Sequence, residues 1–221
     1  SESDNHHVRR LASEGCRPRL PWGRALKNFK KDPQPILPIL ENLKQDETGY
    51  VRRSVANNLN DISKDHPELV KQIVRSWKGK HPDTDRLVKH ACRTLLKAGD
   101  SETLELFGYA AVEHIALHNL TTSSQVVMGD SLEFSFDLQS IDNKTLGQLR
   151  IEYAIGFHRP GKKPGRKVFK ISEGLFPGQA KTVTRQHSFR PVSTRRYYPG
   201  PHQLEIILNG ESVAQAGFEL E

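Results

Sequence analysis

The first half of the chain carries apolar residues at the three- and four-residue spacing of amphipathic helices. Val8, Leu11 and Ala12 form the first such stripe, and Gly15 follows it as a helix stop. Proline, glycine and aspartate separate the later stripes, because these residues interrupt or cap helices. The pattern predicts helices over residues 8–14, 22–31, 35–44, 48–64, 67–78, 83–98 and 101–109.

The period changes at about residue 111. Short alternating or β-branched runs follow, separated by turn pairs such as Pro177-Gly178 and Asn209-Gly210. They predict strands over residues 114–119, 126–128, 131–138, 149–155, 167–171, 181–189, 203–209 and 212–219. So many short strands without a helix are typical of an immunoglobulin-like or fibronectin-like β-sandwich. We therefore expect a multidomain chain, α then β, with helices in residues 1–110 and a sandwich in residues 111–221.

Three of the predicted helices share one sequence pattern. VRRLASEG begins at Val8, VRRSVANNL at Val51 and VKHACRTLL at Val88, so the offsets are 43 and 37 residues. Helical pairs of the HEAT type have this period and stack into a solenoid. The second and third positions of the blocks are basic: Arg9, Arg10, Arg52, Arg53, Lys89 and His90. Stacking places them along one edge, either as a ridge that tracks a phosphate backbone or as ordinary solvated helix faces.

Charge and cysteine usage narrow the classes of function. The chain has 33 Lys and Arg against 26 Asp and Glu, a net charge of +7 and a pI near 9.4, which favours a polyanionic partner. Cys16 and Cys92 indicate free thiols in a reducing, cytoplasmic compartment, and no apolar run is long enough for a membrane span. Nuclease metal clusters, phosphate-cradling glycine loops and nucleophile elbows are absent from the sequence. We expect a monomer without metal or cofactor.

Residues 8–22, VRRLASEGCRPRLPW, place a single acid among arginines. Glu14 stands at the end of the predicted helix, and Pro18 and Pro21 prevent the helix from resuming. The neighbouring cations, which should keep Glu14 ionised, are Arg9, Arg10, Arg17, Arg19 and Arg24. Two interpretations stay open. Either Glu14 forms an ordinary ion pair that shapes the turn, or the arginines hold phosphates while Glu14 faces a cation.

Two loops of the predicted sandwich are also basic. Residues 158–170, HRPGKKPGRKVFK, gather six cations between glycines and prolines, and residues 195–198 read RRYY. The first loop is either a solubilising hairpin or a second nucleic-acid contact. The second loop combines cations with aromatic rings that can contact sugar and phosphate.

The segments VRRLASEGCRPRLPWGRAL, VRRSVANNLNDISKDHP and DTDRLVKHACRTLLKAGD, followed by a sandwich, resemble the AlkC branch of the HEAT-like repeat DNA glycosylases. The resemblance covers nearly the whole chain. It implies excision of cationic N-methylated bases, such as 3-methyladenine and 3-methylcytosine, from double-stranded DNA without base flipping. It also implies a bacterial, nucleoid-associated cytoplasmic protein whose sandwich helps the solenoid to wrap the duplex. On this comparison the chain begins partway through the repeat array, after a further family acid.

Roles for individual residues follow from the resemblance. Glu14 and Asp61 match the family's active-site acids and would stabilise positive charge on the deoxyribose as the glycosidic bond breaks. Trp22 would contact the sugar or the cationic base through its ring face. The cations that would bind DNA are Arg10, Arg17, Arg19, Arg52, Arg53 and Lys89 in the helices, and Arg159, Lys162, Lys163 and Arg166 in the sandwich. This enzyme would be a monofunctional N-glycosylase. The alternative is a non-catalytic DNA-binding or protein-scaffolding solenoid.

Overall fold

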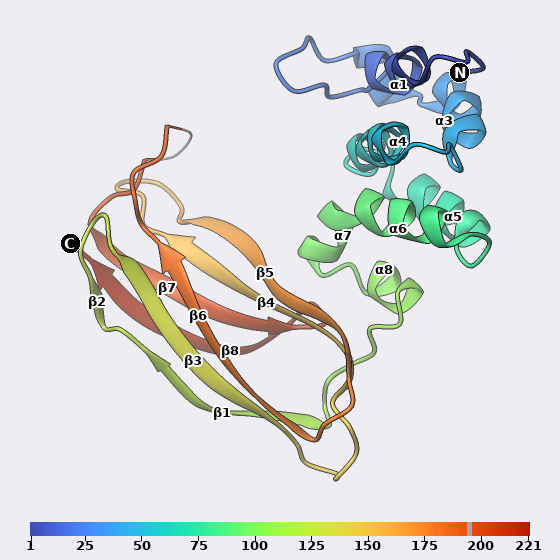
Figure 1. The fold of residues 1–221 in the computed structure, drawn as a ribbon. Helices are drawn as coiled ribbons and strands as arrows, with labels where there is room; N and C mark the ends of the chain where they lie inside the picture. The colour runs from blue at the N-terminus through green and yellow to red at the C-terminus, as the bar shows by residue number, and fades with distance from the viewer. Residues whose placement is uncertain (194–195) are drawn as a thin grey trace. The chain divides into compact units, whose positions relative to one another are not determined.

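The computed structural model describes residues 1–193 and 196–221 (Figure 1). The chain forms two compact units, Ser1–Phe107 and Gly108–Glu221, where the sequence predicted a boundary after residue 110. The first unit is helical and the second is built of β-strands, so the predicted order of α then β is confirmed. Within the described residues, the structure contains no helix that is both long enough and apolar enough to cross a membrane.

The helical unit consists of short helices joined by tight turns. They are α1 (His6–Gly15), α2 (Lys27–Lys31), the 3-10 helix η1 (Gln34–Ile36), α3 (Leu37–Leu43), α4 (Gly49–Ile62), α5 (Pro67–Trp77), α6 (Pro82–Ala91), α7 (Arg93–Ala98) and α8 (Ser101–Leu106). Two predictions were wrong in detail. The helix expected over residues 22–31 begins only at Lys27, because a tight turn precedes it. The helix expected over residues 83–98 is interrupted at Cys92, whose backbone lies outside the helical region.

Helix α4 is the central element of this unit, since it packs against α1 on one side and α6 on the other. The spacing of Val51, Val55 and Leu59 predicted its buried stripe, and all three side chains are fully buried. The apolar stripe expected on α1 is not buried: Val8 is 48% exposed and Leu11 is 67% exposed. Instead, α1 turns a polar face toward α4.

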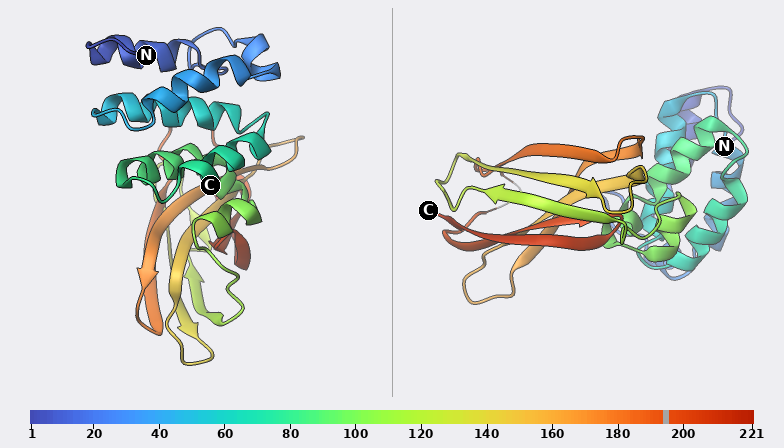
Figure 2. Two further views of the ribbon diagram at one scale, coloured as in Figure 1. Left: turned by 90° about the vertical axis from the view of Figure 1, so that its right-hand side faces the viewer. Right: turned by 90° about the horizontal axis from the view of Figure 1, so that it is seen from below.

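The second unit is a β-sandwich of eight strands. They are β1 (Ile115–Thr122), β2 (Gln125–Val126), β3 (Ser131–Ser140), β4 (Gly147–Phe157), β5 (Gly165–Phe176), β6 (Ala180–Ser188), β7 (Gly200–Leu208) and β8 (Glu211–Leu220). The strands form two sheets, and Figure 2 shows this unit from two further sides. One sheet has the order β1-β3-β6 and the other β2-β8-β7-β4-β5. All pairs are antiparallel except β2 with β8. Every strand predicted from the alternation is present, with shifted ends.

Alternating side chains of the two sheets form the core of the sandwich. Phe134 and Phe136 of β3 pack in the same cluster as Ile151 and Ile155 of β4. The Asn209-Gly210 pair joins β7 to β8, and both residues have positive φ, of 45° and 84°. A two-residue hairpin turn needs this left-handed backbone, which asparagine and glycine adopt at low cost.

Candidate active site

The candidate site lies where the C-terminal ends of α1 and α4 meet. Helix α1 ends at Gly15, and the side chain of Arg17, two residues later, reaches back to Glu14 in the last turn of α1. The Arg17 side chain is 7% exposed and reaches the last turn of α4. It contacts two carboxylates there, one from each helix. We call these three residues the Glu14–Arg17–Asp61 cluster.

Glu14 is held at both of its carboxylate oxygens. Its Oε1 accepts a hydrogen bond from Arg17 Nη1 at 2.6 Å, and its Oε2 accepts one from Ser54 Oγ at 2.8 Å. Arg10 Nη2 lies 3.4 Å from Oε2. Burial raises the pKa of Glu14, but the hydrogen bonds from Ser54 and Arg17 and the positive charges of Arg17 and Arg10 outweigh it. The pKa is therefore below its ordinary value, and Glu14 is ionised at neutral pH.

Asp61 is the more deeply buried acid, with a side chain that is 3% exposed. Its Oδ2 accepts from Arg17 Nε at 2.9 Å, and its Oδ1 lies 3.1 Å from Lys64 Nζ. Burial lowers the pKa of Arg17, but its hydrogen bonds to Asp61 and Glu14 raise the pKa by more, so the guanidinium stays charged. Both carboxylates thus accept hydrogen bonds from the guanidinium of Arg17. The guanidinium of Arg17, for which the sequence predicted a phosphate contact, is thus buried between the two acids.

Buried polar residues hold the two helices in register around the cluster. Ser54 Oγ, which donates to Glu14, accepts from Ser13 Oγ at 2.7 Å. Asn58 Nδ2 donates to the backbone oxygen of Ser13 at 2.9 Å. Ser13, Ser54 and Asn58 are all fully buried. Sequence reasoning missed Ser13 and Ser54, and the signal that marks them is polar side chains at helix positions that face a neighbouring helix.

Trp22 stands fully exposed in a strained turn, with a relative accessibility of 106% and a φ of 61°. The turn is closed by Gly23 N–H donating to the carbonyl of Leu20 at 3.1 Å, with Pro21 and Trp22 at its centre. Glycine is the usual residue at the positive-φ position of such a turn. A bulky residue there costs about 1–2 kcal/mol. The ring therefore has a position that neither burial nor backbone preference explains.

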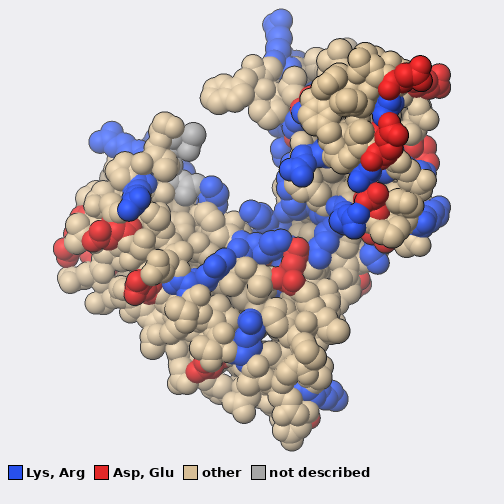
Figure 3. Space-filling view, viewed as in Figure 1, with Lys and Arg blue, Asp and Glu red and all other residues tan. Residues whose placement is uncertain are grey.

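Most of the predicted DNA-binding cations of the helical unit are accessible, and several are paired with acids. The Arg10 guanidinium lies 4.1 Å from the centre of the Tyr50 ring. Arg19 Nη2 is 2.7 Å from Asp65 Oδ1, and Arg52 Nη2 is 3.1 Å from Asp83 Oδ1. In the view of Figure 3, Lys and Arg gather mainly on the left-hand side of this unit and acidic side chains on its right-hand side.

In the sandwich, the loop before β5 and the start of β5 carry the other predicted cations. Lys162 and Lys163 are exposed, while Arg166 Nη2 pairs with Glu205 at 2.8 Å. Arg159 lies directly over Gly165, where an added Cβ would be 2.6 Å from its guanidinium. In the basic-aromatic loop, the Arg196 guanidinium lies 5.2 Å from the centre of the Tyr198 ring, and Arg195 falls outside the described residues.

The described part of the chain contains no group of three or more His, Cys, Asp or Glu placed to hold a metal ion. The free cysteines are Cys16, which is half-buried, and Cys92, which is buried. Burial raises the pKa of the Cys92 thiol to about 12. Cys92 is consequently a protonated core residue at neutral pH.

Comparisons with known proteins place this geometry in context. Residues 116–221 match the family described as the C-terminal Ig-like domain of the uncharacterised protein YhaZ. The chain is 51% identical over 222 residues to the uncharacterized protein YhaZ of Bacillus subtilis, covering all of this chain and 61% of that protein. It is also similar to the alkylpurine DNA glycosylase AlkC of Pseudomonas fluorescens, solved bound to DNA with an abasic site analog. That match has a TM-score of 0.95 and 38% identity, over all of this chain and 62% of that one. The chain thus spans about three-fifths of the length of these relatives.

Proposed function

We propose that this chain belongs to a DNA glycosylase that excises cationic N-methylated bases, of the 3-methyladenine and 3-methylcytosine class, from duplex DNA. The observation that carries the proposal is the Glu14–Arg17–Asp61 cluster, in which one buried guanidinium holds two carboxylates in place. The similarity of the whole chain to an alkylpurine DNA glycosylase supports it. The net charge of +7 supports a DNA partner.

The chemistry needs charge stabilisation more than proton donation. A methylated base that is already cationic leaves with the electron pair of its C1′–N bond, and positive charge develops on the deoxyribose. Water then adds its oxygen to C1′ and loses a proton, which a carboxylate accepts. Fixed carboxylates stabilise the positive sugar without reorganising during the reaction.

The charge balance of the cluster suits this task. Two carboxylates and one guanidinium give the buried group a net charge of −1, the complement of a single positive charge. Lys64 and Arg10 lie at its rim, 3.1 Å from Asp61 and 3.4 Å from Glu14, and their side chains are 38% and 26% exposed. Both acids would present their negative charge to a cation once these two partly exposed side chains turn away.

Trp22 and the surrounding cations complete the proposed site. The exposed ring of Trp22 is available to contact the sugar or the cationic base, as an aromatic face attracts a cation. Arg10, Arg19, Arg52, Arg53 and Lys89 would hold phosphates, together with Arg159, Lys162, Lys163 and Arg166 of the sandwich. We propose excision without base flipping, as the resemblance to the AlkC branch implies. The pocket between α4 and α6 is lined by neither acid.

Release of free base from defined duplexes tests the proposal. One duplex carries 3-methyladenine and a matched duplex carries a neutral alkylated base, O6-methylguanine. We expect release from the first and none from the second, because the neutral base leaves as a poor anion. Binding to both duplexes without release from either would contradict the proposal and favour a non-catalytic DNA-binding or scaffolding surface.

A further inference from the structure

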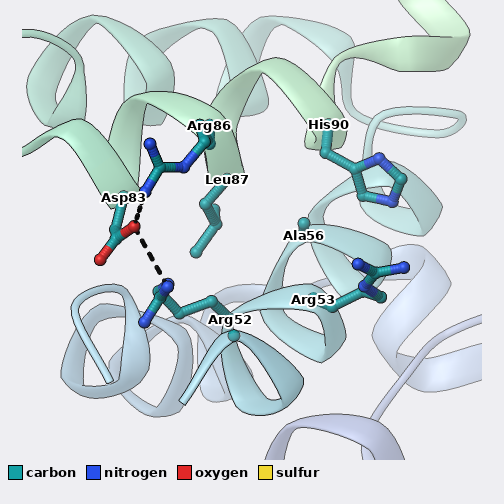
Figure 4. A pocket seen from close by; sticks show the side chains of 8 residues that line it. Arg52, Arg53, Ala56, Asp83, Arg86, Leu87 and His90 are labelled. Carbon is teal, nitrogen blue, oxygen red and sulfur yellow. Dashed lines mark hydrogen bonds and ion pairs between the residues drawn. The ribbon is translucent and has the colours of Figure 1, made fainter. Parts of the chain in front are cut away.

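A separate pocket of about 320 Å³ lies between α4 and α6 (Figure 4). Helix α4 contributes Arg52 and Arg53, and α6 contributes Asp83, Arg86 and His90. Three arginines against one aspartate give the lining a net charge of +2 with His90 neutral. The pocket therefore has a positive charge that its own residues do not balance.

The positive charge is concentrated at one end. At the other end, Asp83 pairs with both Arg52 and Arg86, which balances much of their charge. Figure 4 shows Arg53 and His90 side by side, away from Asp83. Arg53 is exposed, and among the described residues no hydrogen bond or ion pair to its guanidinium occurs. Its five N–H groups are thus available to an external acceptor.

The surroundings of His90 are also cationic. Burial lowers the pKa of the imidazole, and the positive charges of Arg93 on α7 and Arg53 on α4 lower it further. On its own helix, Arg86 lies one turn earlier, and Asp83 is already shared between two arginines. An anion bound beside His90 would reverse this effect, because it favours the imidazolium.

We propose that the Arg53–His90 end of this pocket binds one phosphate group of a DNA strand. A guanidinium fork matches the oxygens of a phosphate, and an adjacent imidazole supplies a further donor. This inference rests on the proposed function, since it assigns the phosphate to DNA. Arg86 is not among the residues predicted from the sequence to bind DNA, and His90 entered only in the open alternative of a basic ridge along the repeats.

The position of Arg53 on α4 relates this pocket to the acids. Arg53, Asn57 and Asp61 follow one another at four-residue spacing, so they share one side of the helix. Asn57 also accepts from Arg93 Nη2 at 3.1 Å, which ties this row to α7. Eight residues of helix rise about 12 Å. Arg53 thus lies about 12 Å along α4 from Asp61, so the bound phosphate would be near the acids but not in contact with them.

The sequence repeat shows why Arg53 and His90, and not Arg10, are free to bind a phosphate. Arg10, Arg53 and His90 occupy the third position of the three repeated blocks. Arg10 already contacts Glu14 and the Tyr50 ring. Arg53 and His90 face each other across adjacent helices with an open pocket between them.

The test compares the salt dependence of binding to an unmodified duplex for the native chain, Arg53→Gln and the control Arg75→Gln. Arg75 is an arginine of α5 with a side chain that is 45% exposed, and it lies outside the pocket. Loss of one phosphate contact lowers the slope of log K against log salt by about 0.9. Between 50 and 200 mM salt, the native chain should therefore lose about 3.5-fold more affinity than Arg53→Gln. Arg75→Gln should match the native chain, and equal slopes in all three proteins would overturn the proposal.

A second measurement identifies the ligand. Inorganic phosphate is titrated at constant ionic strength while the ring signals of His90, assigned with His90→Gln, are followed by NMR. We expect a saturable shift and a raised His90 pKa in the native chain, and neither in Arg53→Gln. A saturable shift with an unchanged DNA slope would mean that the pocket takes a free oxyanion, which overturns the assignment to DNA. Base release with unchanged slopes would sink this inference alone, whereas absence of duplex binding would contradict the proposed function as well.

Discussion

Replacing Arg17 by methionine tests whether its guanidinium holds the two acids together. The substitution keeps a long, flexible side chain but removes the donors that lie 2.6 Å from Glu14 Oε1 and 2.9 Å from Asp61 Oδ2. Breaking a buried ion pair by removing one partner costs about 3–5 kcal/mol, because an uncompensated charge is left behind. Glu14 keeps its hydrogen bond from Ser54, and Asp61 keeps Lys64 at 3.1 Å. We therefore expect a loss near the lower limit, about 3 kcal/mol.

Urea unfolding followed by circular dichroism at 222 nm measures this loss, because the affected unit is the helical one. The double variant Arg17→Met with Asp61→Asn separates charge from packing. Neutral asparagine needs no counter-ion, so the double variant should recover about 1 kcal/mol or more of the loss. Arg17→Lys should fall between the native chain and Arg17→Met, since an ammonium group cannot bridge both acids as a planar fork does. A loss below about 1 kcal/mol in Arg17→Met, or no recovery in the double variant, would refute the reasoning.

Three further predictions address the turn, the support of Glu14 and the sandwich loop. Trp22→Gly should raise the free energy of unfolding by up to about 1 kcal/mol, because glycine relieves the positive-φ strain, and it should slow base release. Unfolding midpoints and single-turnover base release measure the two effects. A variant less stable than the native chain would contradict the strain argument. Ser54→Ala removes a hydrogen bond to a carboxylate and should cost about 1.5–3 kcal/mol at pH 7. Because the pKa of Glu14 is lowered in the folded state, the stabilisation by its carboxylate is complete above the unfolded pKa and is lost as the pH falls through the folded pKa. The difference in unfolding free energy between the native chain and Ser54→Ala, measured by urea titration, should therefore shrink below about pH 4. Lys162→Glu with Lys163→Glu should lower the salt slope of duplex binding by at least about 1.8, and an unchanged affinity would remove this loop from the DNA-binding surface.

Much of the fold could be predicted from the sequence, because periodicity reports burial directly. The period-2 runs after residue 111 led to all eight strands, and the stripe of Val51, Val55 and Leu59 marked the central helix. Pairing of strands and the composition of each sheet did not follow, because they depend on contacts between distant segments. The apolar stripe of Val8 and Leu11 wrongly suggested a buried face, since α1 packs against α4 through the polar contact between Ser13 and Ser54.

The candidate site could be predicted only in part from the sequence. A lone Glu14 among arginines pointed to an ionised acid, and the resemblance singled out Asp61, but no spacing rule indicates that Arg17 bridges them across two helices. The charge run that suggested a phosphate contact for Arg17 looks the same in sequence whether the side chain is buried or exposed. Trp22 was chosen by resemblance, while the strain of its turn emerged only from the backbone.

The measurement that tests the central claim most directly is base release by Asp61→Asn beside Asp65→Asn. Asp65 follows Asp61 by four residues, in the turn after α4, but Asp61 is buried against Arg17, whereas Asp65 pairs with Arg19 near the surface. We predict that Asp61→Asn slows release of 3-methyladenine by about 10²-fold or more, with little change in affinity for the duplex, and that Asp65→Asn retains the native rate. Release at the native rate by Asp61→Asn, or an equal loss in both variants, would contradict the assignment of catalysis to the Glu14–Arg17–Asp61 cluster.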